Sequence, residues 1–270
     1  MFKPALSFVL VSLFFLSACQ PSGETSTPPI GTEKEAGYQE EPQTTEQNGS
    51  QSFRAQRAET APNVDGRGDD ACWEKATWLP LDQRWLGEAY TETDFQGRYK
   101  LSWDENYLYL LAEIVDDTLI DIHPDGLDRY WDDDCLEIFI DEDRSKGNHQ
   151  YNHNAFAYHV SLDNRVVDIG TDSTFRYYDD HLTSRRTQEG KTSTWEVALK
   201  VFGDDYRDGA ADNRPVRMAA GKICGFALAY CDNDASAERE NFIGSVTVTG
   251  EDKNRGWIDA GIFGSLELVE

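Results

Sequence analysis

Two tryptophans stand in polar, acidic stretches of the chain. Residues 130–137 read Tyr-Trp-Asp-Asp-Asp-Cys-Leu-Glu, and residues 254–259 read Asn-Arg-Gly-Trp-Ile-Asp. Trp131 and Trp257 therefore have few apolar neighbours in sequence to pack against. Sugars present apolar C–H faces that stack on aromatic rings and hydroxyls that require hydrogen bonds, so this pattern favours a carbohydrate site. The alternatives are core anchoring for both tryptophans and a solvated strand face for Glu137.

Metal chemistry has weaker candidates. Asp232 and Asp234 follow an expected strand and supply the oxygen ligands that calcium prefers, although the same residues are also typical of an Asx turn. His149 and His153 are four residues apart in Asn-rich surroundings that do not predict a helix, which favours a surface loop over a metal site. The only cofactor that we expect is therefore structural calcium.

Signatures of catalysis are missing from the sequence. It contains no Gly-x-Ser-x-Gly elbow, no P-loop and no His-Glu-x-x-His motif. With 50 Asp and Glu residues, a glycosidase-like pair of carboxylates arises by chance. We predict a binding protein that is not an enzyme, with a glycan-processing enzyme as an alternative.

The elements that would position these residues are short strands. Residues 135–141 alternate strictly, with Leu136, Ile138 and Ile140 on one face. Residues 99–103 and 107–115 predict a hairpin around Asp-Glu-Asn, and further strands are expected at 155–162, 165–169, 194–202, 223–230 and 265–269. No amphipathic helix of any length is evident. The pattern predicts an all-β fold, an antiparallel β-sandwich of jelly-roll or immunoglobulin-like type.

The charge balance limits the possible partners. The chain has 50 acidic and 25 basic residues, a formal net charge of −25. This argues against binding nucleic acid, whose phosphates require basic surface. It suits solubility and the coordination of hard cations.

The N-terminus predicts export. Residues 1–18 combine Lys3, an apolar run and small residues, which is typical of a signal peptide. Leu-Ser-Ala-Cys at 16–19 resembles a bacterial lipobox, which makes Cys19 the expected lipid attachment site and Gln20 a sign of outer-membrane sorting. Residues 19–57 are rich in Glu, Thr, Ser, Gln and Pro, so they predict a disordered acidic tether. We expect the folded domain to span residues 58–270, on either face of the outer membrane.

Four cysteines remain after Cys19: Cys72, Cys135, Cys224 and Cys231. In an oxidising compartment they could pair in three ways. Cys224 and Cys231 bracket one expected strand and lie too far apart to bond, so any disulfide would join different strands. Their spacings match no zinc motif.

From about residue 60 to 270 the chain resembles the family 9 carbohydrate-binding modules. The matching blocks are Pro-Asn-Val-Asp-Gly at 62–66, Leu-Ser-Trp-Asp-Glu-Asn-Tyr-Leu-Tyr at 101–109, Trp-Asp-Asp-Asp-Cys-Leu-Glu-Ile-Phe-Ile-Asp at 131–141, Trp-Glu-Val-Ala-Leu at 195–199, Gly-Phe at 225–226, Arg239 and Trp-Ile-Asp-Ala-Gly-Ile-Phe-Gly at 257–264. The resemblance implies a β-sandwich with structural calcium that holds a terminal sugar between two tryptophan rings.

Carried over position by position, the resemblance places those two rings at Trp131 and Trp257. It places the acidic partner at Glu137 and a rim amide at Asn254. His159 stands where the family has a rim arginine, and it is expected to complete the polar set.

Two further positions depart from the family. Ala229 and Cys231 replace a rim glutamine and a rim asparagine. The aromatic clamp is therefore expected to be intact, while the polar contacts that select the sugar are changed. Which sugar binds, and whether reducing ends are preferred, is left open.

We expect the sugar-binding domain to capture glycan for neighbouring glycoside hydrolases or transporters, with the lipid as its membrane contact. Two alternatives stay open besides an enzyme. One is an envelope interaction module that kept the fold and lost sugar binding. The other is a haem-binding redox module, for which Met218 is the only internal methionine ligand.

Overall fold

A computed structural model describes residues 51–123 and 125–270. The predicted signal peptide, Cys19 and most of the predicted tether lie outside the described residues. Across the described ranges, no helix combines the length and the apolar composition needed to cross a membrane.

The regular secondary structure of the described residues is nearly all β-strand. Its first strands are β1 (Ser52–Arg57), β2 (Leu79–Leu81), β3 (Gln83–Leu86), β4 (Phe95–Trp103), β5 (Leu108–Asp116), β6 (Cys135–Asp141) and β7 (Phe156–Ser161). They are followed by β8 (Val166–Ile169), β9 (Phe175–Tyr177), β10 (Leu182–Glu189), β11 (Thr192–Leu199), β12 (Ile223–Asp232), β13 (Asn241–Gly244) and β14 (Gly264–Val269). The helical pieces are one turn of α-helix, α1 (Cys72–Lys75), and two 3-10 turns, η1 (Arg255–Trp257) and η2 (Ala260–Ile262).

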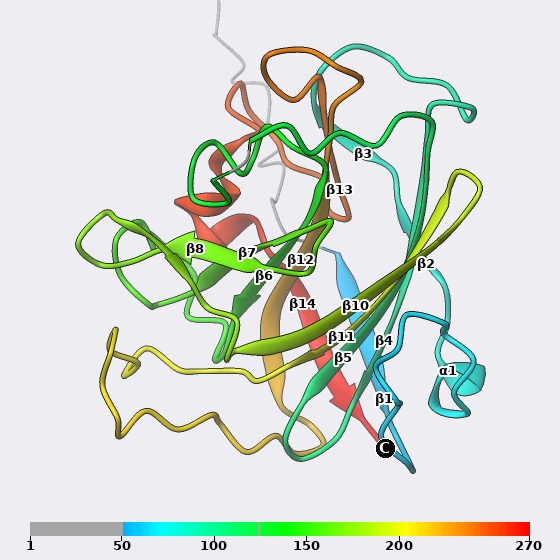
Figure 1. Cartoon of the computed structure of the whole chain (residues 1–270). Coiled ribbons are helices and arrows are strands. Elements are labelled where there is room, and N and C mark those ends of the chain that lie inside the picture. Colours follow the sequence, from blue (N-terminus) through cyan, green and yellow to red (C-terminus); the bar gives the residue numbers. More distant parts are fainter. Residues whose placement is uncertain (1–50, 124) are drawn as a thin grey trace, which may run out of the picture. The chain divides into compact units, whose positions relative to one another are not determined.

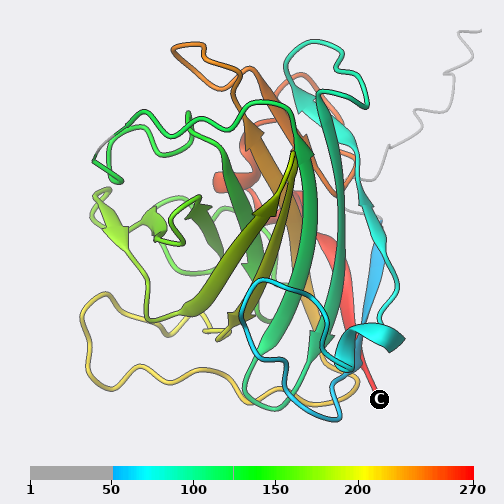
Figure 2. The same ribbon diagram turned by 45° about the vertical axis from the view of Figure 1, so that its right-hand side comes forward.

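All the strands join one hydrogen-bonded sheet. Its order is β10-β11-β5-β4-β1-β14-β12-β6-β7-β8-β9, while β2 pairs with β4, and β13 pairs with β12 and β3. The sheet curls, so that β10 and β11 cross in front of β12 and β14 (Figure 1). Figure 2 shows β4 and β5 in front, β12 and β14 behind, and β1 (blue) where the two layers meet. Apolar side chains from both layers fill the interior.

The predicted strands are confirmed, with bounds shifted by one to three residues and β4 beginning four residues earlier. Residues 135–141 form β6 with the predicted bounds. The pairing is antiparallel throughout except at β1, which runs parallel to both β14 and β4. β1 also shows that the folded unit begins before residue 58, since Ser52–Arg57 lies inside the predicted tether. Only Phe53 and Ala55 point inward on β1, and two apolar residues in a polar stretch are too few to predict a strand.

β6 is the central strand for the site, and both of its faces are covered. Leu136, Ile138 and Ile140 point to one side, and Cys135, Glu137 and Phe139 to the other; all are buried. The strand-face alternative for Glu137 is therefore wrong, because Glu137 is only 2% exposed. Strand alternation identified which residues share a face, but the loops that cover this face come from distant parts of the chain.

Candidate functional site

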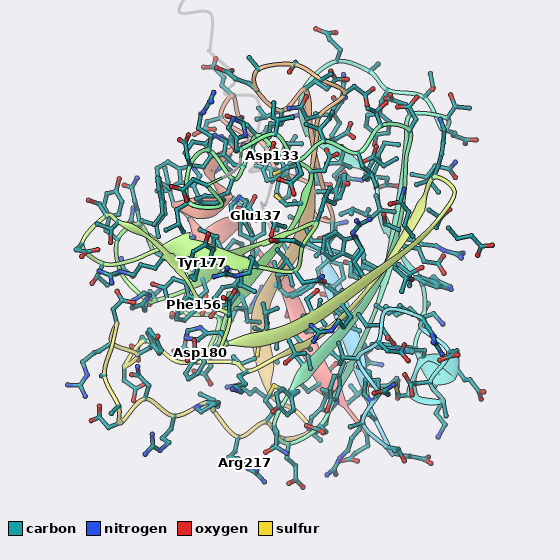
Figure 3. The ribbon with its side chains drawn as sticks, in the orientation of Figure 1. Asp133, Glu137, Phe156, Tyr177, Asp180 and Arg217 are labelled. Carbon is teal, nitrogen blue, oxygen red and sulfur yellow. The ribbon has the colours of Figure 1, made fainter. Side chains whose placement is uncertain are left out.

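A cavity of about 340 Å³ opens over the Glu137 face of β6. It lies between the loop that precedes β6, the segment carrying η1, and strands β8, β9 and β13. The structure brings all five predicted sugar residues to its lining: Trp131, Glu137, His159, Asn254 and Trp257. In Figure 3, Glu137 lies within the body of the domain, whereas Arg217 lies at its periphery. The cavity therefore combines two half-buried tryptophans with buried titratable side chains, Glu137 and His159.

Trp131 is half-buried at the end of the loop that leads into β6. Its ring packs edge-on against Tyr130 at 5.0 Å and Phe175 at 5.6 Å between centroids. The three aspartates that follow it are buried, and their oxygens accept hydrogen bonds from backbone N–H groups of this loop and of the segment after β12. Asp133, for example, accepts from the backbone N–H groups of Ile122 and His123 at 2.9 and 3.1 Å. These hydrogen bonds hold the loop in place, and they therefore hold Trp131 in place as well.

Trp257 is half-buried on η1, and a histidine holds that turn in place. The Nε2 of His149 donates to the Gly256 carbonyl at 2.7 Å, and the His149 N–H donates to the Ile258 carbonyl at 2.8 Å. Gly256 is required because an added Cβ would lie 2.9 Å from the ring of Phe139. His149 lies in a largely exposed loop between β6 and β7, as predicted, but its own side chain is buried and orients the second aromatic wall of the cavity.

Glu137 and His159 form the floor of the cavity. They are register partners on β6 and β7, and the Oε2 of Glu137 lies 3.2 Å from the Nε2 of His159. The Nδ1 of His159 lies 3.2 Å from the Ala157 carbonyl oxygen, which can only accept, so Nδ1 is the donor. Burial opposes the charge on His159, but the Glu137 carboxylate and the Cys231 sulfur outweigh burial and raise the pKa of His159 to about 10. Burial also raises the pKa of Glu137, so the two side chains form a desolvated pair.

Arg239 also lines the cavity, and it had no assigned role in the sequence. Its Nη2 donates to the Oδ1 of Asn254 at 2.7 Å, and its Nη1 donates to the Sγ of Cys231 at 3.1 Å. The guanidinium lies 4.1 Å from the centre of the Phe242 ring. Arg239 was visible only as a matching position in the family pattern, because its loop shows no periodicity. It places a guanidinium group beside Asn254 at the edge of the Glu137–His159 floor.

The two positions that depart from the family pattern, Ala229 and Cys231, lie on β12 beside this floor. Ala229 is the register partner of Glu137, and Cys231 is the register partner of Cys135. Both are fully buried. Cys72, Cys135, Cys224 and Cys231 are free cysteines.

The two calcium candidates separate into different acidic groups. Asp232 joins Asp116 and Asp134, whose carboxylate oxygens lie within 4.8 Å of one another and are buried. Asp234 joins Asp94 and Asp117 in a more exposed group. Burial, with repulsion from Asp116, raises the pKa of Asp134 to about 9 and that of Asp232 to about 8. Three buried carboxylates without a cation repel one another, so the first group fits a hard divalent ion.

Comparisons with known proteins identify one family by sequence, and the solved structures share its fold. The model of the family described as "Carbohydrate family 9 binding domain-like" matches residues 64–270. Among curated proteins, the chain is 27% identical over 262 residues to endo-1,4-beta-xylanase C of Paenibacillus barcinonensis, covering 95% of this chain and 21% of that protein. It is 26% identical over 209 residues to exoglucanase XynX of Acetivibrio thermocellus, covering 77% and 16%. The chain thus spans about a fifth or less of the length of these relatives.

Solved structures show the same fold. A carbohydrate binding module family 9 from Caldicellulosiruptor kristjanssonii in complex with cellotriose superposes with a TM-score of 0.62 at 20% identity, covering 81% of this chain and 94% of that one. The glucose complex of a family 9 module from the same organism gives a TM-score of 0.60, also at 20% identity, covering 81% and 95%. The curled sheet described above is therefore an arrangement that the family shares.

Proposed function

The chain belongs to the carbohydrate family 9 binding domain-like family, and from this membership we propose that it binds a sugar in the cavity over β6 without cleaving it. One ring stacks between Trp131 and Trp257, which lie half-buried at the rim. The observation that carries the proposal is the convergence of both tryptophans and a charged, desolvated floor on one cavity. Aromatic walls bind the C–H faces of a pyranose, and fixed polar groups bind its hydroxyls.

The floor selects the sugar by hydrogen bonding. Glu137 accepts from hydroxyls, Asn254 contributes its amide, and Arg239 donates from the guanidinium that already holds Asn254. Because these groups are paired with one another before ligand arrives, they need little rearrangement to bind it. A ligand hydroxyl that fails to match leaves a buried polar group unpaired, at a cost of about 1–3 kcal/mol.

The ligand class that we propose is a glucose- or xylose-containing β-1,4 glycan end. The named activities of the relatives are xylanase and exoglucanase, and the solved neighbours hold cellotriose and glucose. Binding without chemistry is proposed because the matched family is a binding domain, and the match covers only 21% of the longer xylanase.

Calorimetry of the purified protein against glucose, cellotriose and xylo-oligosaccharides tests the proposal. Trp131→Ala and Trp257→Ala each lower affinity at least tenfold, about 1.4 kcal/mol. Trp78→Ala is the matched control, because Trp78 is half-buried outside the cavity, under the guanidinium of Arg98. Normal binding by either rim variant would exclude the two-tryptophan clamp, and release of shorter sugars from the panel would exclude a non-catalytic role.

The acidic group Asp116, Asp134 and Asp232 holds a structural calcium ion in this proposal. It lies at the end of β5, just before β6 and at the end of β12, so one ion ties together three segments next to the cavity loop. The ion offsets the repulsion that desolvation imposes on these carboxylates. It stabilises the loop that carries Trp131 without contacting the sugar.

The protein acts at the cell envelope, anchored by a lipid on Cys19 and extended by the tether. The support for this is the sequence pattern of residues 1–19, which lies outside the described structure. Cys19→Ser moves the protein from the membrane fraction to the soluble fraction of the expressing bacterium if the anchor is correct. Retention of the variant in the membrane fraction contradicts it.

A further inference from the structure

A cluster of two cysteines and one histidine lies next to the sugar cavity. Cys135 on β6, Cys231 on β12 and His159 on β7 meet there because these three strands are neighbours in the sheet. One ligand atom from each lies within 4.8 Å of the other two. All three residues are buried, and both cysteines are free thiols.

These three groups match the donor set of a thiophilic metal ion. Zinc binds thiolate at about 2.3 Å and imidazole nitrogen at about 2.0–2.1 Å, in tetrahedral geometry. Two sulfurs on a tetrahedral zinc are then about 3.8 Å apart, so these groups need to move inward by roughly 1 Å or less. Side-chain rotation of two cysteines on paired strands can supply that movement.

The histidine is already oriented for ligation. Its Nδ1 donates to the Ala157 carbonyl, which leaves Nε2 as the atom that faces the cluster. Ligating histidines usually fix their second ring nitrogen in this way, on a backbone carbonyl or a carboxylate. The Oε2 of Glu137, 3.2 Å from Nε2, is within reach as a fourth ligand.

Charged groups surround the cluster. The Oε2 of Glu137 lies 3.2 Å from the Nε2 of His159, and the Arg239 guanidinium donates to the Sγ of Cys231 at 3.1 Å. Thiolate and carboxylate ligands would offset the charge of a divalent ion beside Arg239, which limits the cost of burying that ion.

We propose that Cys135, Cys231 and His159, with Glu137 as the fourth ligand, bind one zinc ion at the floor of the cavity. The site is separate from the acidic group, because its donors are sulfur and nitrogen instead of carboxylate oxygen alone. His159 and Glu137 serve the metal first in this arrangement, and the sugar meets a metal-supported floor. The proposal stands on the cluster itself and does not depend on sugar binding.

Cobalt(II) tests the site, because it replaces zinc and reports its ligands by absorption. The full-length protein, reduced and freed of metal, is titrated with Co²⁺ under anaerobic conditions. A thiolate-to-cobalt charge-transfer band that saturates at one equivalent and disappears on adding one equivalent of Zn²⁺ is the expected result. Cobalt held by the acidic group has only oxygen ligands and gives no such band.

Variants assign the band to its ligands. Cys231→Ser and His159→Ala lose the band or weaken cobalt binding at least a hundredfold. Cys224→Ser keeps it, and this is a matched control because Cys224 is a buried cysteine on the same strand, β12. The titration of the unaltered protein stands even if a variant fails to fold.

Three outcomes overturn the proposal. They are absence of the charge-transfer band in the reduced protein, retention of the band in Cys231→Ser, and a Cys135–Cys231 disulfide found by mass spectrometry in cells quenched with a thiol-alkylating reagent. The last result identifies the pair as a structural disulfide, which cannot ligate zinc through thiolates.

Discussion

His181 makes the fold sensitive to acid, and the size of the effect can be worked out. The side chain is fully buried, its Nδ1 lies 2.7 Å from the hydroxyl of Tyr158, and its ring packs on Phe202 at 4.3 Å and Phe156 at 5.6 Å. Burial lowers the pKa of His181 from 6.5 to about 4. Asp180 and Asp208 favour its charged form, while His153 and Lys200 oppose it, so burial decides the direction. Phe156 and Asp180, two of these neighbours of His181, are labelled in Figure 3.

The sign follows from proton binding. Between pH 6.5 and pH 4 the unfolded chain binds a proton at His181 that the folded protein does not bind. The contribution of neutral His181 to the free energy of unfolding is therefore fully present above pH 6.5 and is lost as the pH drops toward 4. The loss amounts to about 3 kcal/mol. For a domain of this size it corresponds to a fall in Tm of roughly 6–12 °C.

Thermal unfolding followed by circular dichroism, at constant calcium, isolates this contribution. His181→Asn keeps an acceptor for the Tyr158 hydroxyl but does not titrate, so the Tm gap between the unaltered protein and the variant shrinks by that amount from pH 7 to pH 4. Other titrating groups cancel in the difference. Tyr158→Phe keeps His181 and therefore keeps the pH dependence. A Tm gap that stays constant across this range would refute the assignment.

Two further predictions concern buried carboxylates. Asp232→Asn removes one calcium ligand, so chelation with EDTA lowers the Tm of the unaltered protein but leaves that of the variant unchanged. The exposed Asp69→Asn retains the response, and an equal response in both variants would argue against the ion. Glu196→Gln destabilises the fold by roughly 2–4 kcal/mol in urea denaturation, because the Glu196 carboxylate accepts from the Trp73 indole at 2.9 Å and from three backbone N–H groups. A loss under 1 kcal/mol would show that this cluster is dispensable.

Much of the architecture was readable because strands leave a local signal. The alternation of residues 135–141 predicted β6 with its bounds, and the turn at 104–106 predicted the β4–β5 hairpin. The strands that were missed are short, polar on one side or embedded in loops, as with β9 and β13. These strands pair with neighbours that are distant in sequence, so no local pattern predicts them.

The candidate site also has residues that the sequence predicted and residues that only the structure identified. Trp131 and Trp257 stood out because a large aromatic in an acidic loop is unusual by itself, and the family pattern added Glu137 and Asn254. Arg239 was missed as a site residue because its role depends on where the loop after β12 folds. The predicted aromatic pair and the residues beneath it share one cavity, although their binding of sugar stays a prediction.

The sequence by itself determined the all-β class and most of the strands, because each rests on residue types within a short window. Local signals of the same kind predicted the aromatic pair and the membrane anchor, which stay predictions. The tertiary structure decided which faces are buried and which distant side chains meet. Cys135, His159 and Cys231 are spread over almost 100 residues, yet strand register places them within 4.8 Å of one another. Asp232 and Asp234, two residues apart, fall into different groups because Asp232 ends β12, whereas Asp234 lies in the bend after it, where strand alternation no longer sets the direction of the side chain. Proximity in a sheet is set by register and curvature, which only the folded chain specifies.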